Sequence, residues 1–285
     1  MPERGGAGFA GASAVSARRS LRSRRVRGGH VCLSFAVIIC PMGIRTLEEA
    51  AAFVDRVGLA LVFPRDDVVL PSLWTAAGGE DQFAERDADG NFVRWTEPMH
   101  FVWPTKDELP AKKLCAAGKH VRGRASLVAL DVLPALVALA DREPADELER
   151  EVVDALAGGP QSTRDLPDLL PAHERKRVRA AIDRLQKRFV VTNAGLEETD
   201  GWPAIVVDLV DRRYRDRLRK LPAPDDARRV VAARVLDAVG ELTAEDLRGA
   251  LGWRKADCVA ALEATGAPTR DEAGFVVWTT ATSSR

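Results

Sequence analysis

The residues that could do chemistry gather in one stretch of the N-terminal half, where aromatic and charged side chains follow one another closely. Trp74 and Trp103 have flat apolar faces on which a nucleobase could stack, and Asp107 beside Lys106 is a carboxylate that could activate a water molecule. Tryptophan is more often a core residue, however, and the Lys-Asp-Glu run after Thr105 also suits the first turn of a helix that Thr105 would cap. The stretch therefore has two interpretations, one catalytic and one structural.

Motifs of the common cofactor and metal enzymes are absent from the sequence. It has no P-loop and no GxGxxG, HExxH or GxSxG pattern. Its histidines are too scattered to predict a metal site: His30, His100, His120 and His173. We therefore expect no metal and no cofactor, which argues against a nucleotide-driven or zinc-dependent enzyme.

The strongest charge pattern lies in a predicted helix over residues 173–188, which has seven basic side chains against two acidic ones. When the apolar side chains of this helix face the core, the basic ones lie on its outer face. Such a face can contact DNA phosphates, although a solvated surface in an arginine-rich sequence is the alternative. The predicted DNA-contacting residues of this helix are Arg175, Lys176, Arg179, Arg184 and Lys187, with Lys176 and Lys187 pointing directly away from the core.

A second basic stretch covers residues 211–220 and includes Arg212 and Arg213. Phosphate contacts need positive charge but little specificity, so these two arginines could extend the DNA-contacting surface. The stretch could equally be the wet side of a linker helix whose arginine stems cover apolar surface.

Two segments have the element order that is typical of a winged helix, namely three helices followed by a β-ribbon. In residues 145–221, a capping box at Ser162 opens the short second helix, the basic helix follows, and a strand enters a turn at residues 193–195. Residues 225–281 repeat this order, with a capping box at Thr243, 81 residues after the first. The third helix of the second copy is balanced in charge, so we expect that copy to serve in packing or to contact a protein partner.

Residues 42–141 form a predicted α/β unit. Thr46 caps a helix that ends at a glycine, and a short apolar strand follows. Asp-Gly and Gly-Asn within residues 87–91 predict a hairpin turn. From residue 126 to residue 140 the apolar content predicts a nearly all-buried helix with a kink at Pro134.

The composition is that of an ordinary folded protein with an unusual distribution of charge. The chain has 285 residues, of which 46% are hydrophobic and 29% are charged, so collagen-like, coiled-coil and disordered classes are set aside. Lys plus Arg and Asp plus Glu are each 42, but residues 1–41 hold seven Arg against one Glu. The other 244 residues therefore carry 35 basic and 41 acidic side chains. A protein with such an acidic body can bind DNA only through a local basic patch.

The first 41 residues look unlike the rest of the chain. Their basic start and the apolar run at 31–41 imitate a secretory signal peptide, yet no cleavage site follows, and the run is too short to cross a membrane. We favour the interpretation that Met42 is the native start and that residues 1–41 are a disordered or mis-assigned extension. The four widely spaced cysteines form no disulfide framework, and the predicted location is the cytoplasm.

Several short motifs of this sequence resemble the bacterial AlkZ-related protein family. They are Ser72-Leu73-Trp74, Trp103-x-x-Lys106-Asp107-x-Leu109-Pro110, Gly118-Lys119, and Ser126-Leu127 leading into Leu133-Pro134. The family is distantly related to tandem winged-helix DNA glycosylases, which excise alkylated bases, unhook crosslinks and hold the hydrolytic water with a Gln-x-Gln motif. The resemblance covers about residues 42–215 and implies winged helices, DNA binding and a role related to DNA repair. No two glutamines of this sequence are spaced by two, so the catalytic motif cannot be carried over.

The sequence thus predicts an α+β protein, mainly α, with an N-terminal α/β unit followed by tandem winged-helix units. We expect it to bind double-stranded DNA through the first winged-helix unit, with no membrane association. The alternatives are a DNA glycosylase acting on alkylated or crosslinked bases, and an acidic tandem winged-helix scaffold that binds proteins.

Overall fold

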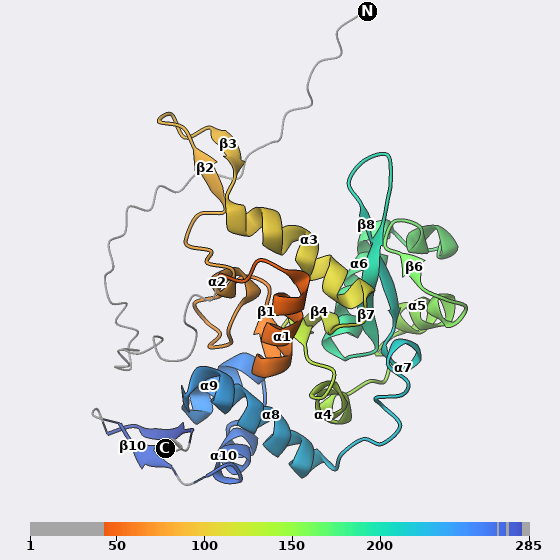
Figure 1. The fold of residues 1–285 in the computed structure, drawn as a ribbon. Helices are drawn as coiled ribbons and strands as arrows, with labels where there is room; N and C mark the ends of the chain where they lie inside the picture. The colour runs from red at the N-terminus through yellow and green to blue at the C-terminus, as the bar shows by residue number, and fades with distance from the viewer. Residues whose placement is uncertain (1–42, 267, 272–273, 281–285) are drawn as a thin grey trace, which may run out of the picture. The chain divides into compact units, whose positions relative to one another are not determined.

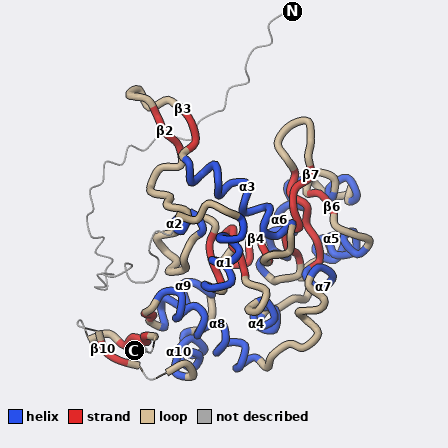
Figure 2. Tube along the Cα trace, viewed as in Figure 1, coloured by secondary structure: helices blue, strands red, loops and turns tan. Residues whose placement is uncertain are grey.

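The structure is a computed structural model that describes residues 43–266, 268–271 and 274–280 (Figure 1). The predictions for residues 1–41 concern a segment outside these ranges. Helices and short strands alternate along the described chain, as Figure 2 shows, and helix is more abundant than strand. None of the described helices is long and apolar enough to cross a bilayer.

The N-terminal unit begins with a helix whose first turn is closed by its own side chains. Thr46 Oγ1 accepts the backbone N–H of Glu49, and Glu49 Oε2 accepts the backbone N–H of Thr46, both at 3.1 Å. This is the capping box that the sequence predicts. Gly58 ends the helix with a φ of 74°, which glycine adopts without strain. The elements of this unit are α1 (Leu47–Val57), β1 (Leu59–Leu61), α2 (Leu73–Ala76), β2 (Ala84–Arg86), β3 (Phe92–Trp95), α3 (Glu97–Ala111), β4 (Ala116–Val121), β5 (Arg124–Val128) and α4 (Leu133–Leu139).

The predicted hairpin is confirmed, and its turn is held by one aspartate. Asp87 Oδ1 accepts the backbone N–H groups of Asp89 at 3.0 Å and Asn91 at 2.8 Å. Gly90 supplies the positive φ, 84°, that the turn requires. Strands β2 and β3 therefore pair on either side of it.

The predicted helix over residues 126–140 is wrong in its first half. Residues up to Val128 belong to strand β5, which lies between β1 and β4 in an antiparallel sheet. Ser126, Leu127 and Val128 of this central strand are all buried, so the apolar run has no alternation that would distinguish it from a helix. Helix α4 begins only at Leu133, and Pro134 lies in its first turn, where a missing N–H costs nothing and causes no kink.

Thr105 does not cap a helix, which corrects the structural interpretation of the Lys-Asp-Glu run. Helix α3 begins at Glu97, and Thr105 lies in its interior with 4% of its surface exposed. Pro104 also lies inside this helix and does not end it. Lys106 and Asp107 therefore belong to the second half of a long helix.

The elements after α4 follow the predicted winged-helix order. The capping contact at Ser162 forms, since its Oγ accepts the Asp165 N–H at 3.2 Å, but it precedes a single 3-10 turn rather than an α-helix. The predicted turn at residues 193–195 is instead a β-bulge, because the register of β7 against β8 shifts between Asn193 and Gly195. The elements are α5 (Glu147–Ala157), β6 (Gln161–Ser162), η1 (Leu166–Leu169), α6 (Arg175–Lys187), β7 (Val191–Glu197), β8 (Ala204–Leu209) and α7 (Val210–Arg213).

The last segment repeats the order a second time. Thr243 and Asp246 form the predicted capping box at the start of the second helix of this segment. The elements are α8 (Pro224–Val239), β9 (Glu241–Leu242), α9 (Ala244–Leu251), α10 (Lys255–Glu263), β10 (Thr269–Arg270) and β11 (Val276–Thr279).

The order of strands in the sheets reveals one more winged helix, at the N-terminal end of the described chain, that the sequence did not predict. It is the first of three along the chain. The three-stranded sheets have the orders β1-β5-β4, β6-β8-β7 and β9-β11-β10. In each, the first strand in the chain lies at one edge and the last lies in the middle. The N-terminal α/β unit therefore has the winged-helix order too, with α3 as its third helix and β4 and β5 as its wing. The hairpin of β2 and β3 is inserted between its second and third helices.

The buried apolar side chains form two clusters. One cluster combines side chains from residues 44–139 with side chains of α8, α9, α10 and β11, so the first and last winged helices share a core. The other is built from the middle winged helix alone, between Leu148 and Val207. The predicted domain boundaries stay predictions, since a shared core does not fix where one unit ends.

Candidate functional site

A cleft of about 370 Å³ lies between α3 and α6, the third helices of the first two winged-helix units. Its floor and walls also include strands of both sheets. Its polar lining residues are Lys106, Asp107, Lys119, Ser126, Thr163, Arg179, Asp183, Gln186 and Asn193. Its apolar lining residues include Val62, Leu127, Ile182, Ile205 and Val207. The cleft thus combines apolar walls with charged and amide groups, as small-molecule and base-binding sites do.

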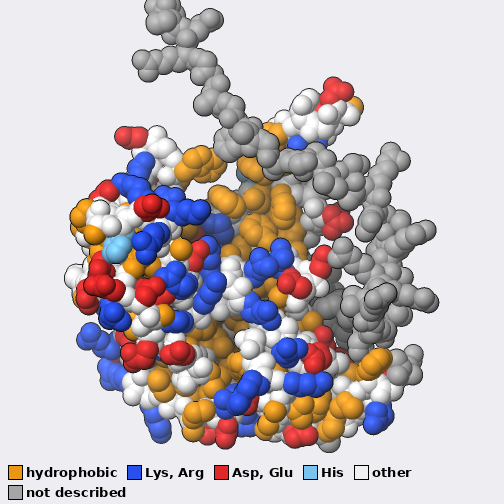
Figure 3. All heavy atoms as spheres, turned by 180° about the vertical axis from the view of Figure 1, so that it is seen from behind, with side chains coloured by type: hydrophobic (Ala, Val, Ile, Leu, Met, Phe, Trp, Pro, Cys, Tyr) orange, Lys and Arg blue, Asp and Glu red, His pale blue; other side chains and the backbone are white. Residues whose placement is uncertain are grey.

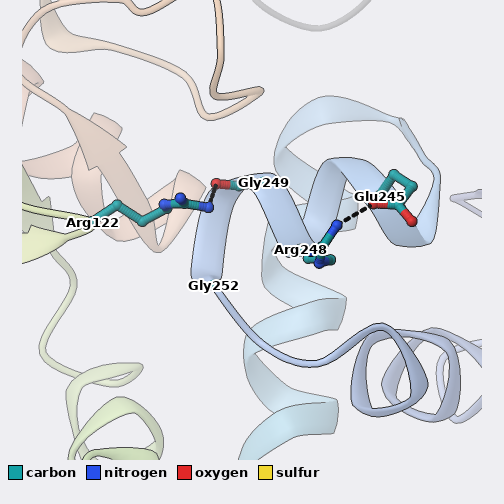
Figure 4. Close-up of a pocket in the computed structure, with 5 residues that line it drawn as sticks. All are labelled: Arg122, Glu245, Arg248, Gly249 and Gly252. Carbon is teal, nitrogen blue, oxygen red and sulfur yellow. Dashed lines mark hydrogen bonds and ion pairs between the residues drawn. The ribbon is translucent and has the colours of Figure 1, made fainter. Parts of the chain in front are cut away.

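A second hollow, of about 410 Å³, lies beside the C-terminal end of α9 (Figure 4). Its side chains are exposed and already engaged: Arg122 Nη1 donates to the Gly249 carbonyl at 3.1 Å, and Arg248 pairs with Glu245 at 3.0 Å. The hydrogen bond from Arg248 holds the pKa of the Glu245 carboxyl below its usual value, with a further contribution from Lys255. Because this hollow has no enclosed reactive group, we take the cleft as the candidate site.

Asp107 is the most enclosed charged side chain of the cleft. Its side chain is 8% exposed, and its Oδ2 forms an ion pair with Lys106 Nζ. The Lys106 ammonium also lies 4.5 Å from the centre of the Trp103 ring, where the ring face attracts a cation. The structure therefore brings the two predicted catalytic residues together in the cleft. Their catalytic role stays a prediction.

A seam of hydrogen bonds joins β4 to α6 along one side of the cleft. Lys119 Nζ pairs with Asp183 Oδ2 at 2.6 Å, and the Lys119 backbone N–H donates to Gln186 Oε1 at 2.9 Å. Gln186 Nε2 in turn donates to Asn193 Oδ1 at 2.7 Å. Gly118 allows this close approach, because a Cβ there would lie 3.3 Å from Gln186 Cδ. The outer face of α6 is therefore partly covered by the first winged helix.

His120 is buried beneath this seam. Its Nδ1 lies 2.6 Å from the Gln186 carbonyl oxygen, and its ring stacks on Phe189 with centroids 4.4 Å apart. Its Nε2 is buried with no hydrogen-bond partner in the described part of the chain. Burial lowers the pKa of His120 to about 4, because the imidazolium would be removed from water.

We expect His120 alone to reduce the free energy of unfolding by about 2 kcal/mol between pH 7 and pH 5. In this window the folded imidazole stays neutral, whereas the unfolded one takes up a proton near its ordinary pKa of 6.5. The unfolded state thus binds more protons and gains stability as the pH falls. Urea denaturation at both pH values measures this loss.

Two variants isolate the contribution of His120. In His120→Gln, the fall in the free energy of unfolding between pH 7 and pH 5 should be smaller than in the wild type by about 2 kcal/mol. In His100→Gln, which changes an exposed position, the fall should equal that of the wild type. Equal pH dependence in wild type and His120→Gln would contradict a buried neutral imidazole.

Four basic side chains of α6 form no hydrogen bond or ion pair with any described residue: Lys176, Arg177, Arg179 and Lys187. Arg179 also lines the cleft. The Lys187 side chain lies over the turn between β4 and β5, since a Cβ on Gly123 would come within 2.7 Å of its Cε. One face of the molecule carries many Lys and Arg side chains around an apolar area (Figure 3).

The other predicted DNA-contacting arginines are bound to groups of the protein itself, and their contact with DNA stays a prediction. Arg175 pairs with Asp168, and Arg184 pairs with both Glu149 and Asp146. Arg212 pairs with Asp208 and donates to the carbonyls of Leu156 and Ala157. Arg213 donates to the carbonyls of Pro110, Ala111 and Ala194. Arg212 and Arg213 thus satisfy carbonyl groups at the C-terminal ends of α5 and α3. These contacts occupy donors that a phosphate would need.

The predicted stacking role of Trp74 is wrong. Its side chain is 1% exposed, its ring packs against Phe63 and Phe83, and its Nε1 donates to the Glu80 carbonyl at 2.8 Å. No face of the ring is open to a base. Trp103, in contrast, is 47% exposed and retains a free surface beside Lys106.

Lys119, Asp183, Gln186 and Asn193 are among the cleft residues that were not predicted as site residues. Lys119 and Asp183 are 64 residues apart in the sequence, so their pairing depends on how the first two winged helices pack. The motif Gly118-Lys119 is the only sequence signal that could have drawn attention to this side of the cleft.

Comparisons with known proteins agree with this architecture. The structure is similar to that of the Streptomyces sahachiroi DNA glycosylase AlkZ, with a TM-score of 0.53 and 19% sequence identity over 84% of this chain and 68% of that chain. No curated protein matches the chain. A family model described as AlkZ related matches residues 44–252. The match extends over most of the chain, and the chain therefore belongs to the AlkZ-related family.

Proposed function

We propose that this protein binds double-stranded DNA through α6, in a role related to DNA repair, and that the cleft receives a base that has left the stack. The observation that carries the proposal is the position of Arg179, an unpaired cation on α6 that also lines the cleft. A phosphate bound by α6 would therefore lie next to a pocket with apolar walls and polar groups, which is the arrangement that an extruded base requires. The family and the glycosylase with a similar fold support the same direction.

The charges of α10, the third helix of the last winged helix, favour α6 as the DNA-binding element of the two. On α10, Lys255 pairs with Glu245 at 3.1 Å, and Arg254, which precedes the helix, pairs with Asp257 at 2.9 Å. Paired cations attract phosphates weakly, whereas cations of α6 such as Lys176 and Arg179, which have no partner among the described residues, can neutralise phosphates and release the counterions of DNA. A protein partner for the last winged helix, predicted over residues 225–281, stays a prediction without further support.

A Lys176→Glu/Arg179→Glu double variant of the full chain tests the proposal. We expect its Kd for a short DNA duplex at low salt to rise about 10-fold to 100-fold, because two phosphate contacts are replaced by repulsion. The slope of log K against log salt should fall by about 2. Fluorescence anisotropy across a salt series measures both quantities.

An Arg219→Glu/Arg248→Glu variant is the matched control, because it changes the net charge equally at exposed positions outside α6. It should bind DNA nearly as well as the wild type. Equal losses in the two variants, or a wild type that fails to bind at low salt, would reject DNA binding by α6.

One observation favours base excision as a second candidate function. Asp107 is an enclosed carboxylate inside the cleft, so it could act as the general base that deprotonates water for attack on the glycosidic carbon. The new C–O bond would replace the C–N bond to the base, and the proton that Asp107 takes from water would be available to the departing base. This candidate has to work without the Gln-x-Gln motif.

A further inference from the structure

The cleft contains an amide whose donor atoms have no partner. Asn193 lies in β7 and lines the cleft together with Gln186. Its oxygen accepts from Gln186, but its Nδ2 has no hydrogen-bond partner among the described residues. Asn193 is partly buried and its Nδ2 is not closed off from solvent, so these donors are available to water or to the acceptor of a ligand in the cleft.

The orientation of this amide follows from a chain of hydrogen bonds that starts at the backbone. The Lys119 N–H can only donate, so the group facing it must be the oxygen of Gln186. Gln186 then presents its nitrogen to Asn193, and Asn193 must present its oxygen in return. Turning over either amide would bring two acceptors or two donors together. The N–H groups of Asn193 are thereby directed away from Gln186.

The backbone also favours this placement. The β-bulge begins at Asn193, which pairs with Val207 before the register shifts at Gly195. Bulges change the direction of the side chains they carry and are frequent beside functional sites. Gly195 packs against Ala111 at the end of α3, where a Cβ would lie 3.2 Å from the Ala111 Cβ. The bulge therefore sits against the helix that carries Asp107.

From these contacts we infer that Asn193 Nδ2 donates a hydrogen bond to an acceptor on the edge of a nucleobase held in the cleft. This inference rests on the proposed function, because it names the group that reads the extruded base. Leu127, Ile182 and Val207 supply apolar walls for the base, and Gln186 acts as a positioning residue for Asn193. Guanine is a suitable ligand, since it offers the acceptors N7 and O6.

The test compares two DNA probes, a duplex with one unpaired guanine and the same duplex without it. We expect the wild type to bind the first probe more tightly. Asn193→Asp replaces the donor with an acceptor while the contact with Gln186 is retained, so it should weaken binding of the unpaired-guanine probe about 10-fold. Asn193→Ala should weaken it about 5-fold. Both variants should bind the fully paired probe within about twofold of the wild type, apart from a small effect of charge.

Asn91→Asp controls for the added charge, because it introduces the same change at the exposed β2–β3 turn. Thermal unfolding of each variant confirms that it is folded. A wild type without preference for the unpaired guanine, or a preference that survives in both Asn193 variants, overturns the inference while DNA binding stands. Failure of the wild type to bind even the paired duplex would instead reject the proposed function.

Discussion

Replacing Glu149 by Ala is expected to lower the free energy of unfolding by about 3 kcal/mol. The Glu149 side chain is completely buried, and its oxygens bind Arg184 Nε at 2.5 Å and Arg188 Nη1 at 3.1 Å. It also accepts the Ala145 N–H at 2.7 Å at the start of α5. Removing the carboxylate leaves Arg188 without an ion-pair partner among the described residues and leaves Arg184 with Asp146 alone. Both arginines reach solvent in part, so we place the loss at the lower end of the range for broken buried ion pairs.

Two variants on the same helix make the measurement specific. Glu149→Gln keeps the size of the side chain and an acceptor for Ala145, so it should cost less than Glu149→Ala. Glu151→Ala removes a side chain that is 37% exposed and pairs with His173, and it should cost less than about 1 kcal/mol. Urea denaturation followed by circular dichroism gives all three values. If the free energy of unfolding of Glu149→Ala lay within 1 kcal/mol of the wild-type value, water would have to reach this ion pair.

Local signals predicted several helix boundaries correctly. The capping boxes at Thr46 and Thr243 and the apolar periodicity of α6 involve residues within one or two turns, and such patterns survive folding unchanged. The Asp-Gly turn at Gly90 is local in the same sense. Elements whose identity depends on distant neighbours were missed. Strand β5 is central only because β1, more than 60 residues earlier, pairs with it.

The N-terminal winged helix could not be predicted for the same physical reason. Its β1 has only three residues, and the inserted hairpin separates its second helix from its third. Pro104 lies inside α3, the third helix of this unit, and a proline at an interior position argues against a continuous helix in the sequence. Only the pairing of β1 with β5 makes the order recognisable.

The charges of the candidate site were predictable, but their partners were not. The basic pattern of α6 correctly indicated a helix with cations on its outer side. Whether a given cation is free depends on acids far away in the chain, as in the pairing of Arg184 with Glu149, which are 35 residues apart. The amide contact between Gln186 and Asn193 depends likewise on the approach of β4. A helical pattern predicts the direction in which a charged side chain points, but it does not predict which residue that side chain pairs with.

Replacing Asp107 by Asn is expected to lower the rate of base release from methylated duplex DNA by about 100-fold or more, if this protein is a glycosylase. Asn has the same shape and can still accept a hydrogen bond from Lys106, so the cleft should keep its geometry. It cannot take a proton from water, which is the step that the carboxylate would perform. The affinity for DNA should stay within about twofold, because Asp107 is enclosed and does not belong to the free basic surface of α6.

The measurement counts the alkali-labile sites that appear when methylated plasmid DNA is incubated with excess protein. Asp183→Asn is the matched control, because it removes the same charge from the same cleft at a side chain that is 40% exposed and pairs with Lys119. Its rate should fall less than about 10-fold, since a more exposed carboxylate contributes less to a water-activating site. Equal rates for Asp107→Asn and the wild type would remove Asp107 from the mechanism. A wild type that releases no base would reject base excision from such DNA while leaving binding by α6 intact, because that binding depends on Lys176 and Arg179 and not on the acid.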